Sequence, residues 1–231
     1  QPAGADAGDA SGMMKGAIFD VDGVLLDSME EWDRLGETYL AGLGIRAEKG
    51  LADTLAVMSM EEGAAWLIGH YGLSKTVEQA VEEMAGVMRE AYACRIPEKN
   101  GVENYLRGLA EAGIPMVIAT SGDRDNARMA LERLGLWKYF RAMLTCTQVG
   151  AGKSQPDIFL AAAKILEGVP EEIWVFEDAP HAAATARAAG FHVAAVKDGQ
   201  NARQEAQLAQ TADIYLKDYG DFEMFRKKAG I

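Results

Sequence analysis

Short apolar runs alternate with amphipathic stretches along much of the chain. A continuous apolar run predicts a buried strand, whereas apolar residues spaced three or four apart predict a helix with one buried face. By these criteria, we expect strands in residues 113–123, 142–149, 172–179, 192–196 and 213–216, and helices in residues 125–136, 156–168 and 180–190. Strands that alternate with helices are typical of a parallel sheet with helices on both faces. The pattern therefore predicts the α/β class.

A different pattern interrupts this alternation near the N-terminus. From Met29 onward, apolar residues recur at helical spacing, and Ser59 and Glu62 fit a helix-capping pair. Residues 76–93 read as a further helix. We therefore expect an all-helical cap domain inserted into the sheet domain. The expected domains are a core of residues 14–27 and 97–231 and a cap of residues 28–96.

Polar residues follow several apolar strands where each strand ends. Ala17, Ile18 and Phe19 form a buried-strand run that ends in Asp20 and Asp22. Taken alone, this pair is as consistent with a strand followed by a capping residue as with a binding site. Ligands of open parallel sheets, however, bind beyond the carboxyl ends of the strands. The residues that could meet there are Asp20, Asp22, Thr120, Ser121, Lys153, Glu177 and Asp178.

The chemistry of these residues points to a metal ion and a phosphate group. Several carboxylates gathered at one edge repel one another unless a cation lies among them. Carboxylate oxygens are the ligands that Mg²⁺ prefers, and substrate phosphate often completes its coordination. Lys153 adds a second positive charge, and Thr120 and Ser121 add hydroxyl and amide donors for anionic oxygens. The sequence thus predicts a site for Mg²⁺ and a phosphate ester.

Four segments in order resemble the motifs of the haloacid dehalogenase superfamily. They read FDVDGVLLDS, VIATS, GKSQPDIF and FEDAPHAAATARAAG, and the resemblance covers about residues 14–200. The helical insert resembles the cap of the subfamily that contains beta-phosphoglucomutase and many small-molecule phosphatases. The resemblance implies a Rossmann-like core with an inserted cap, an enzyme with an aspartyl-phosphate intermediate, and Mg²⁺ as cofactor.

The same resemblance implies a role for each residue. Asp20 is the expected nucleophile and Asp22 the expected general acid and base. Thr120, Ser121 and Lys153 are expected to bind the phosphoryl group. The expected metal ligands are Asp20, the backbone carbonyl of Asp22, and Asp178, with Glu177 either a ligand or orienting a metal-bound water. Gly122 and Ser154 stand where the family commonly has a second hydroxyl and a proline.

Hydrolysis of a small phosphorylated metabolite is the expected reaction, with two alternatives. Mutases of the subfamily carry a histidine and an arginine in the cap, where this chain has Trp32 and Met60. A cap without those groups binds a second phosphate poorly, which favours a phosphatase over a phosphosugar mutase. The other alternative is a non-catalytic phospho-acceptor or binding module. Phospho-accepting receiver modules are about half as long and lack a cap. The family's dehalogenases lack the second aspartate of the first motif, so Asp22 also argues against dehalogenation.

Composition narrows the partners and the compartment. The net charge is −12, which argues against nucleic acid and anionic membranes as partners. Cys94 and Cys146 lack metal-type spacing and are expected to be free thiols in a reducing cytoplasm. Residues 1–13 are expected to be a disordered tail or an expression remnant, with no secretion signal. We expect a monomer or weak homodimer.

Several conspicuous residues have ordinary structural interpretations. We expect Asp27 to cap the following helix or to support the site from behind, rather than to bind metal. His70, His181 and His192 are widely spaced and are expected to be non-catalytic. The large apolar residues of the cap are expected to form its own core, with some of them facing the substrate as the minority interpretation. These residues are Trp32, Met58, Met60, Trp66 and Tyr71.

Overall fold

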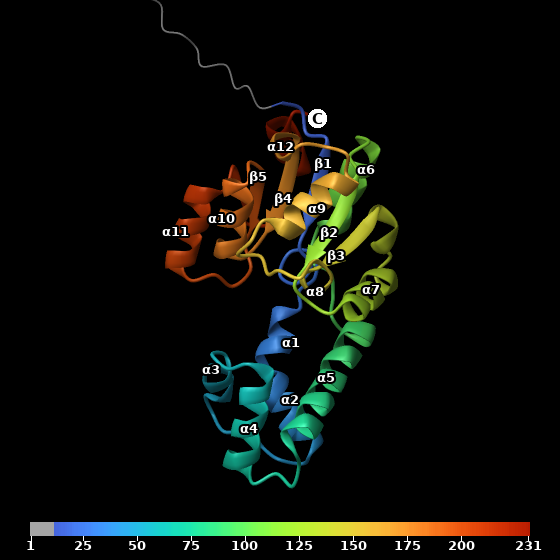
Figure 1. Cartoon of the computed structure of the whole chain (residues 1–231). Coiled ribbons are helices and arrows are strands. Elements are labelled where there is room, and N and C mark those ends of the chain that lie inside the picture. The colour runs from blue at the N-terminus through green and yellow to red at the C-terminus, as the bar shows by residue number, and fades with distance from the viewer. Residues whose placement is uncertain (1–11) are drawn as a thin grey trace, which may run out of the picture.

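A six-stranded parallel sheet forms the centre of the larger domain in the computed structural model, which describes residues 12–231 (Figure 1). The strand order is β3-β2-β1-β4-β5-β6, and every neighbouring pair is parallel. The strands are β1 (Gly16–Phe19), β2 (Met116–Thr120), β3 (Ala142–Thr145), β4 (Ile173–Glu177), β5 (His192–Val196) and β6 (Ile214–Leu216). The predicted α/β class is confirmed.

Helices cover both faces of this sheet because successive residues of a strand point to opposite sides. Along β4, Trp174 and Phe176 pack into one hydrophobic cluster, while Ile173 and Val175 pack into the other. One face is covered by α6 (Val102–Glu111), α7 (Arg124–Arg133) and α12 (Phe222–Ala229). The other is covered by α9 (Asp157–Ile165), α10 (Pro180–Ala188) and α11 (Ala202–Thr211). The short helices η1 (Trp137–Tyr139) and η2 (Pro170–Glu172) lie in connections.

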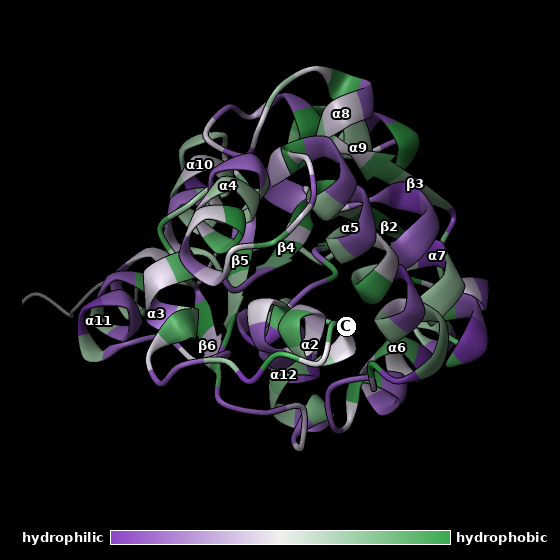
Figure 2. Cartoon of the chain, turned by 90° about the horizontal axis from the view of Figure 1, so that it is seen from below, coloured by the Kyte–Doolittle hydropathy of each residue, from purple (hydrophilic) through white to green (hydrophobic). Residues whose placement is uncertain are grey.

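Five helices between β1 and α6 form a separate cap below the carboxyl ends of the strands (Figure 1). They are α1 (Met29–Asp33), α2 (Leu35–Gly42), α3 (Leu51–Leu55), α4 (Met60–Tyr71) and α5 (Val77–Cys94). Figure 2, which views the chain from the cap end, shows hydrophilic and hydrophobic residues interspersed on these helices. The inserted cap is confirmed, whereas its boundaries at residues 28 and 96 remain a prediction.

The cap is held together by the apolar faces of its helices. Thr76 begins α5 with a complete capping box to Gln79, and Ser59 begins α4 by accepting a hydrogen bond from the Glu62 amide. The longest cap helix, α5, buries Met84 and further apolar residues against α2 and α4. Its C-terminal part also packs on α7 of the core, which fixes one side of the cap to the sheet domain.

Two local predictions are wrong. Residues 142–149 are not one strand, because β3 ends at Thr145 and α8 (Cys146–Val149) begins there with a capping box between Thr145 and Gln148. Asp27 does not cap α1, since Ser28 occupies the N-cap position and no side chain caps that helix. Asp27 is exposed, and its amide donates to the Pro97 carbonyl. The prediction for residues 1–13 falls almost entirely outside the described residues.

Candidate active site

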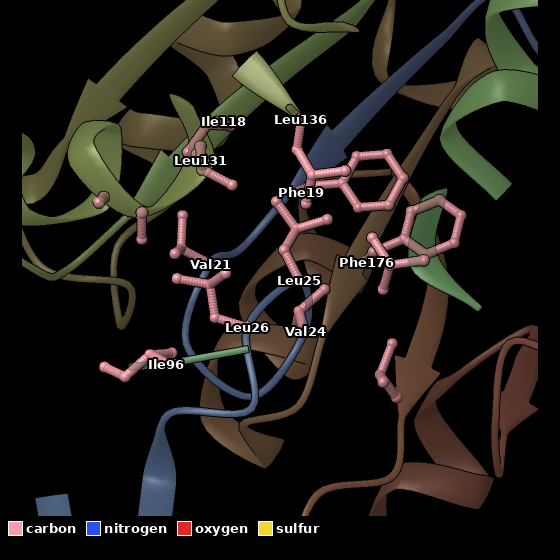
Figure 3. Packing of buried hydrophobic residues seen from close by; sticks show 14 of the residues in the cluster. Phe19, Val21, Val24, Leu25, Leu26, Ile96, Ile118, Leu131, Leu136 and Phe176 are labelled. Carbon is pink, nitrogen blue, oxygen red and sulfur yellow. The ribbon is translucent and has the colours of Figure 1, made fainter. Parts of the chain in front are cut away.

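The loop after β1 is a rigid support for the first two acidic residues. Val21, Val24, Leu25 and Leu26 are fully buried, and Figure 3 shows them clustered beneath the end of β1. The amides of Leu25 and Leu26 both donate to the Val21 carbonyl, which closes a tight turn. The alternation of buried apolar residues with the acids therefore anchors the loop while presenting carboxylates at its surface.

Strand register brings Asp20 beside Glu177. Phe19 pairs with Phe176 across β1 and β4, and the Asp20 amide donates to the Phe176 carbonyl at 3.1 Å. Carboxylate oxygens of Asp20, Glu177 and Asp178 all lie within 4.8 Å of one another. The carboxyl ends of two adjacent strands thus place three predicted site residues together.

Lys153 lies between two of these carboxylates. Its Nζ donates to Asp20 Oδ1 at 2.8 Å and to Glu177 Oε2 at 2.7 Å, and only 4% of its side chain is exposed. Burial disfavours the charged amine, but the two carboxylates outweigh burial and raise the pKa of Lys153. Lys153 is therefore a fixed cation beside Asp20.

One lysine does not balance three buried acids. Burial, followed by the nearby charge of Asp20, raises the pKa of the Glu177 carboxyl to about 7 and that of Asp178 to about 9. These directions reflect the cost of concentrating negative charge in a partly dry site. The donor set of three hard oxygen ligands fits Mg²⁺, which would remove that cost.

The Asp22 side chain points away from the acidic cluster and toward the cap. It accepts hydrogen bonds from Ser28 Oγ at 2.6 Å and from the Tyr92 hydroxyl at 2.5 Å. Burial raises the pKa of Asp22, although both hydrogen bonds act in the opposite direction. A carboxyl with a raised pKa is suited to carry a proton at neutral pH.

Thr120 ends β2 and Ser121 follows it, beside this acid. Thr120 is buried and its Oγ1 accepts from the Gly122 amide at 3.0 Å, which leaves its hydroxyl proton to be donated. A Cβ placed at Gly122 would lie 3.2 Å from Asp22 Oδ2 and 3.4 Å from Thr120 Oγ1. The glycine thus allows Asp22 and Thr120 to approach the same point. The Ser121 side chain is exposed and its Oγ lies 3.5 Å from Cys146 Sγ.

Sequence reasoning missed a second ion pair at the edge of the site. Lys99 Nζ donates to Asp198 Oδ1 at 2.8 Å, to the Lys197 carbonyl at 2.6 Å and to the Gly23 carbonyl at 3.1 Å. A Cβ at Gly23 would clash with Asp178 and lie 2.8 Å from Asp198 Oδ2. Asp198 follows β5, the neighbour of β4, so its place after a strand was an available signal. No sequence pattern around Lys99 indicated that it would lie at the site.

His70 and His192 pair with acids outside the Asp20, Glu177 and Asp178 cluster. His70 is 2.9 Å from Glu48 within the cap. His192 is the first residue of β5, at the amino-terminal end of the strand, and lies near Asp213. His181 is exposed on α10. Cys94 and Cys146 are both free within residues 12–231. In the same part of the chain, no helix is both long and apolar enough to span a bilayer.

The cap aromatic and methionine residues divide into two groups. Trp66 and Tyr71 pack against the hydrophobic core, as predicted. Trp32, Met58 and Met60 instead line a cavity inside the cap, although Met60 also packs against the core. The prediction that Trp32 belongs to the cap core is therefore wrong: 36% of it is exposed, and its indole N–H donates to the Tyr92 hydroxyl at 2.9 Å.

Comparison with known proteins identifies the class. Residues 14–190 match the haloacid dehalogenase-like hydrolase family. The chain is 29% identical over 216 residues to validoxylamine A 7'-phosphate phosphatase of Streptomyces hygroscopicus subsp. limoneus, covering 89% of this chain and 94% of that protein. It is 31% identical over 202 residues to hexitol phosphatase A of Escherichia coli (strain K12), covering 87% and 90%.

A solved structure agrees with these relatives. A Thermotoga maritima protein provisionally named beta-phosphoglucomutase superposes with a TM-score of 0.84 at 25% identity, covering 93% of this chain and 99% of the other. The chain belongs to the haloacid dehalogenase-like hydrolases, in the branch that contains phosphatases and phosphomutases. The predicted family and enzyme class are confirmed.

Proposed function

We propose that the protein is a Mg²⁺-dependent phosphatase that hydrolyses a small phosphorylated metabolite through an aspartyl-phosphate intermediate. One observation carries the proposal: Lys153 is fixed between Asp20 and Glu177, with Asp178 in the same cluster. A carboxylate can attack an anionic phosphate only where fixed positive charge offsets their repulsion. The named phosphatases among the relatives support the same reaction class.

Each residue has a defined task in this reaction. The Asp20 carboxylate attacks phosphorus, and the bond from phosphorus to the leaving oxygen breaks. Asp22 donates its proton to that oxygen, and afterwards takes a proton from the water that attacks the phospho-enzyme and releases phosphate. Lys153 screens Asp20, while the Thr120 hydroxyl and the Ser121 amide donate to the phosphoryl oxygens.

Asp20, the Asp22 carbonyl and Asp178 are the proposed Mg²⁺ ligands. When bound, Mg²⁺ supplies the positive charge that offsets the negative charge of phosphate. Glu177 lies in the same cluster and, like Asp20, accepts a hydrogen bond from Lys153, so it would either bind the metal directly or orient a water beside it.

Phosphate release from a panel of phosphomonoesters tests the proposal. With Mg²⁺, the protein should release inorganic phosphate from at least one substrate, and EDTA should abolish the activity until Mg²⁺ is restored. The Asp20→Asn variant serves as the blank, because a carboxamide cannot form the phospho-enzyme. Full activity in EDTA, or in Asp20→Asn, would refute the site as assigned.

A phosphosugar mutase is the second candidate because of the likeness to a provisionally named beta-phosphoglucomutase. A mutase must hold a second phosphate in the cap. Among the described residues, no basic residue lines the cavity inside the cap, and the basic residue at the neighbouring cavity is the exposed Arg89. We therefore expect beta-glucose 1-phosphate, if accepted, to give inorganic phosphate. Glucose 6-phosphate forming faster than inorganic phosphate, followed by phosphorus NMR, would favour the mutase.

We further propose that the protein works in the cytoplasm as a monomer or weak homodimer, without nucleic acid or membrane partners. The free thiols of Cys94 and Cys146 support a reducing compartment. The net charge of −12 disfavours polyanionic partners.

A further inference from the structure

A half-open apolar cavity of about 410 Å³ lies among the five helices of the cap. This volume is within the range of about 300–1,000 Å³ found for small-molecule sites. Its lining residues include Trp32, Leu55, Ala56, Met58, Met60 and Leu67. Within residues 12–231, no lysine, arginine or histidine lines it. Beyond the Trp32 indole, its polar side chains are Asp33 and Ser59, and Ser59 Oγ already accepts from the Glu62 amide.

Two hydrogen bonds connect the cavity wall to the proposed general acid. The Trp32 indole donates to the Tyr92 hydroxyl at 2.9 Å, and that hydroxyl donates to Asp22 Oδ1. In the proposed reaction, Asp22 gives its proton to the leaving oxygen. The group attached to that oxygen must therefore lie on the cap side of Asp22, where Trp32 stands.

A second cavity joins this region to the core. It has a volume of about 470 Å³ and shares Trp32 and Met60 with the first. It is also lined by Arg89 of α5 and by Asp123, which directly follows the turn at Ser121 and Gly122, and by Asn126 of α7. A substrate whose phosphate binds at this turn can therefore extend past Trp32 and Met60 into the cap cavity.

The lining selects against polar leaving groups. Hydroxyl groups of a sugar would give up their hydrogen bonds to water and find few partners in this cavity. A second phosphate inside the cap cavity would face Asp33, whereas the exposed Arg89 lines the second cavity. An apolar skeleton gains from burial, the flexible methionines can adjust to its shape, and the Trp32 ring offers a flat surface for a ring.

We propose that the cap cavity binds the leaving group, and that the preferred substrates are monophosphates of apolar, ring-sized alcohols rather than of sugars. This inference rests on the proposed phosphatase function. It names a substrate class that differs from the hexitol phosphates of the relative named for them. Bisphosphates should also be poor substrates, because Asp33 lines the cavity and no basic residue among residues 12–231 does.

A matched substrate pair tests the inference. Cyclohexylmethyl phosphate and glucose 6-phosphate each carry a six-membered ring on a phosphorylated methylene, but only the second carries ring hydroxyls. The wild-type enzyme should prefer cyclohexylmethyl phosphate by about tenfold or more in kcat/KM, since one tenfold step corresponds to a modest binding difference. Equal values, or a preference for glucose 6-phosphate, would overturn the inference.

A matched pair of variants tests the location. Ala56 lines the cavity, whereas the adjacent Val57 does not line it and is 87% exposed. Ala56→Phe should fill the cavity and lower kcat/KM for cyclohexylmethyl phosphate by about tenfold relative to acetyl phosphate, whose leaving group is small. Val57→Phe should leave this ratio unchanged. Identical ratios in the two variants would place the leaving group elsewhere.

Binding separates failure of this inference from failure of the proposed function. Cyclohexylmethylphosphonate cannot be hydrolysed, and calorimetry should show that it binds wild-type protein about tenfold more tightly than methylphosphonate does. Ala56→Phe should remove that difference, and Val57→Phe should retain it. If no phosphomonoester is hydrolysed, the proposed function fails and the phosphonate measurement alone decides the cavity. Equal binding of the two phosphonates would overturn the inference even if acetyl phosphate is hydrolysed.

Discussion

Replacing Lys153 with methionine should destabilise the protein in a manner that depends on pH. Methionine keeps most of the apolar stem but removes the ammonium that donates to Asp20 and Glu177 at 2.8 and 2.7 Å. Each lost charge-assisted hydrogen bond contributes about 1.5–3 kcal/mol. Removing one partner of a buried ion pair typically costs about 3–5 kcal/mol, because the remaining charge is left uncompensated. We expect a loss in that range.

The pH dependence follows from the carboxyl that remains. The pKa of Glu177 is already raised to about 7, and loss of the lysine should raise it further. A carboxyl whose pKa is higher in the folded state favours folding at low pH and loses that contribution as pH rises toward the folded pKa. In the wild type, the contribution of Glu177 protonation to folding stability has disappeared by about pH 7. In the variant, this contribution continues to decrease above about pH 7. The deficit should therefore be larger at about pH 8.5 than at about pH 5.5.

Urea unfolding of the metal-free proteins measures this deficit directly. Lys164→Met is the matched control, since Lys164 lies exposed on α9 and has no ion pair within the described residues. Its loss should be within about 0.5 kcal/mol. Excess Mg²⁺ should reduce the Lys153→Met deficit at the higher pH by supplying the missing positive charge. A deficit below about 1 kcal/mol, or one equal at both pH values, would refute the reasoning.

Three further predictions concern the acid, the metal and the β1 loop. Asp22→Asn should retain nitrophenyl phosphate cleavage about a hundredfold better than alkyl phosphate cleavage, because nitrophenolate leaves without a proton; equal losses in kcat/KM would contradict its role. Mg²⁺ should raise the Tm more at about pH 8.5 than at about pH 6, because protons on Glu177 and Asp178, with pKa values of about 7 and about 9, compete with metal; equal increments in scanning calorimetry would argue against metal at this cluster. Gly23→Ala should cost more than the roughly 1 kcal/mol expected for Gly44→Ala and should weaken Mg²⁺ binding in calorimetry. Both glycines have similar positive φ, 79° and 75°, but only a Cβ at Gly23 meets Asp178, so equal effects would exclude that contact as the cause.

The sheet was predictable because its signal is local. Residues 192–196 form β5 with the bounds expected from a short apolar run. The strand predicted in residues 142–149 failed because its second half contains Thr147 and Val149, which favour strands, and only the capping box from Thr145 to Gln148 marks the change to helix. Such a cap was readable in principle, yet it competed with a stronger β-type composition.

The site was predictable to the extent that it lies at strand ends. Asp20, Glu177 and Asp178 meet because parallel strands of matched register end at one edge. The partners of Asp22 were not predictable, since Tyr92 is 70 residues away and reaches the acid only through the orientation of α5. Lys99 and Asp198 are separated by 99 residues and were missed for the same reason. Pairing over such distances depends on tertiary packing, which a periodic pattern does not encode.

The two acids of the β1 loop are held by different domains. Asp20 is fixed by Lys153 of the core, whereas Asp22 is held by Ser28 at the start of the cap and by Tyr92 on the last cap helix. Arg133 of the core donates to the Tyr92 carbonyl, so this end of α5 is also tied to the sheet domain. Under the proposed mechanism, a shift of α1 or α5 relative to β1 would change the orientation of Asp22, the proposed proton donor, and leave Asp20, the proposed nucleophile, in place. Substitutions along α5 are accordingly expected to alter the timing of the reaction without altering the affinity of the core for phosphate.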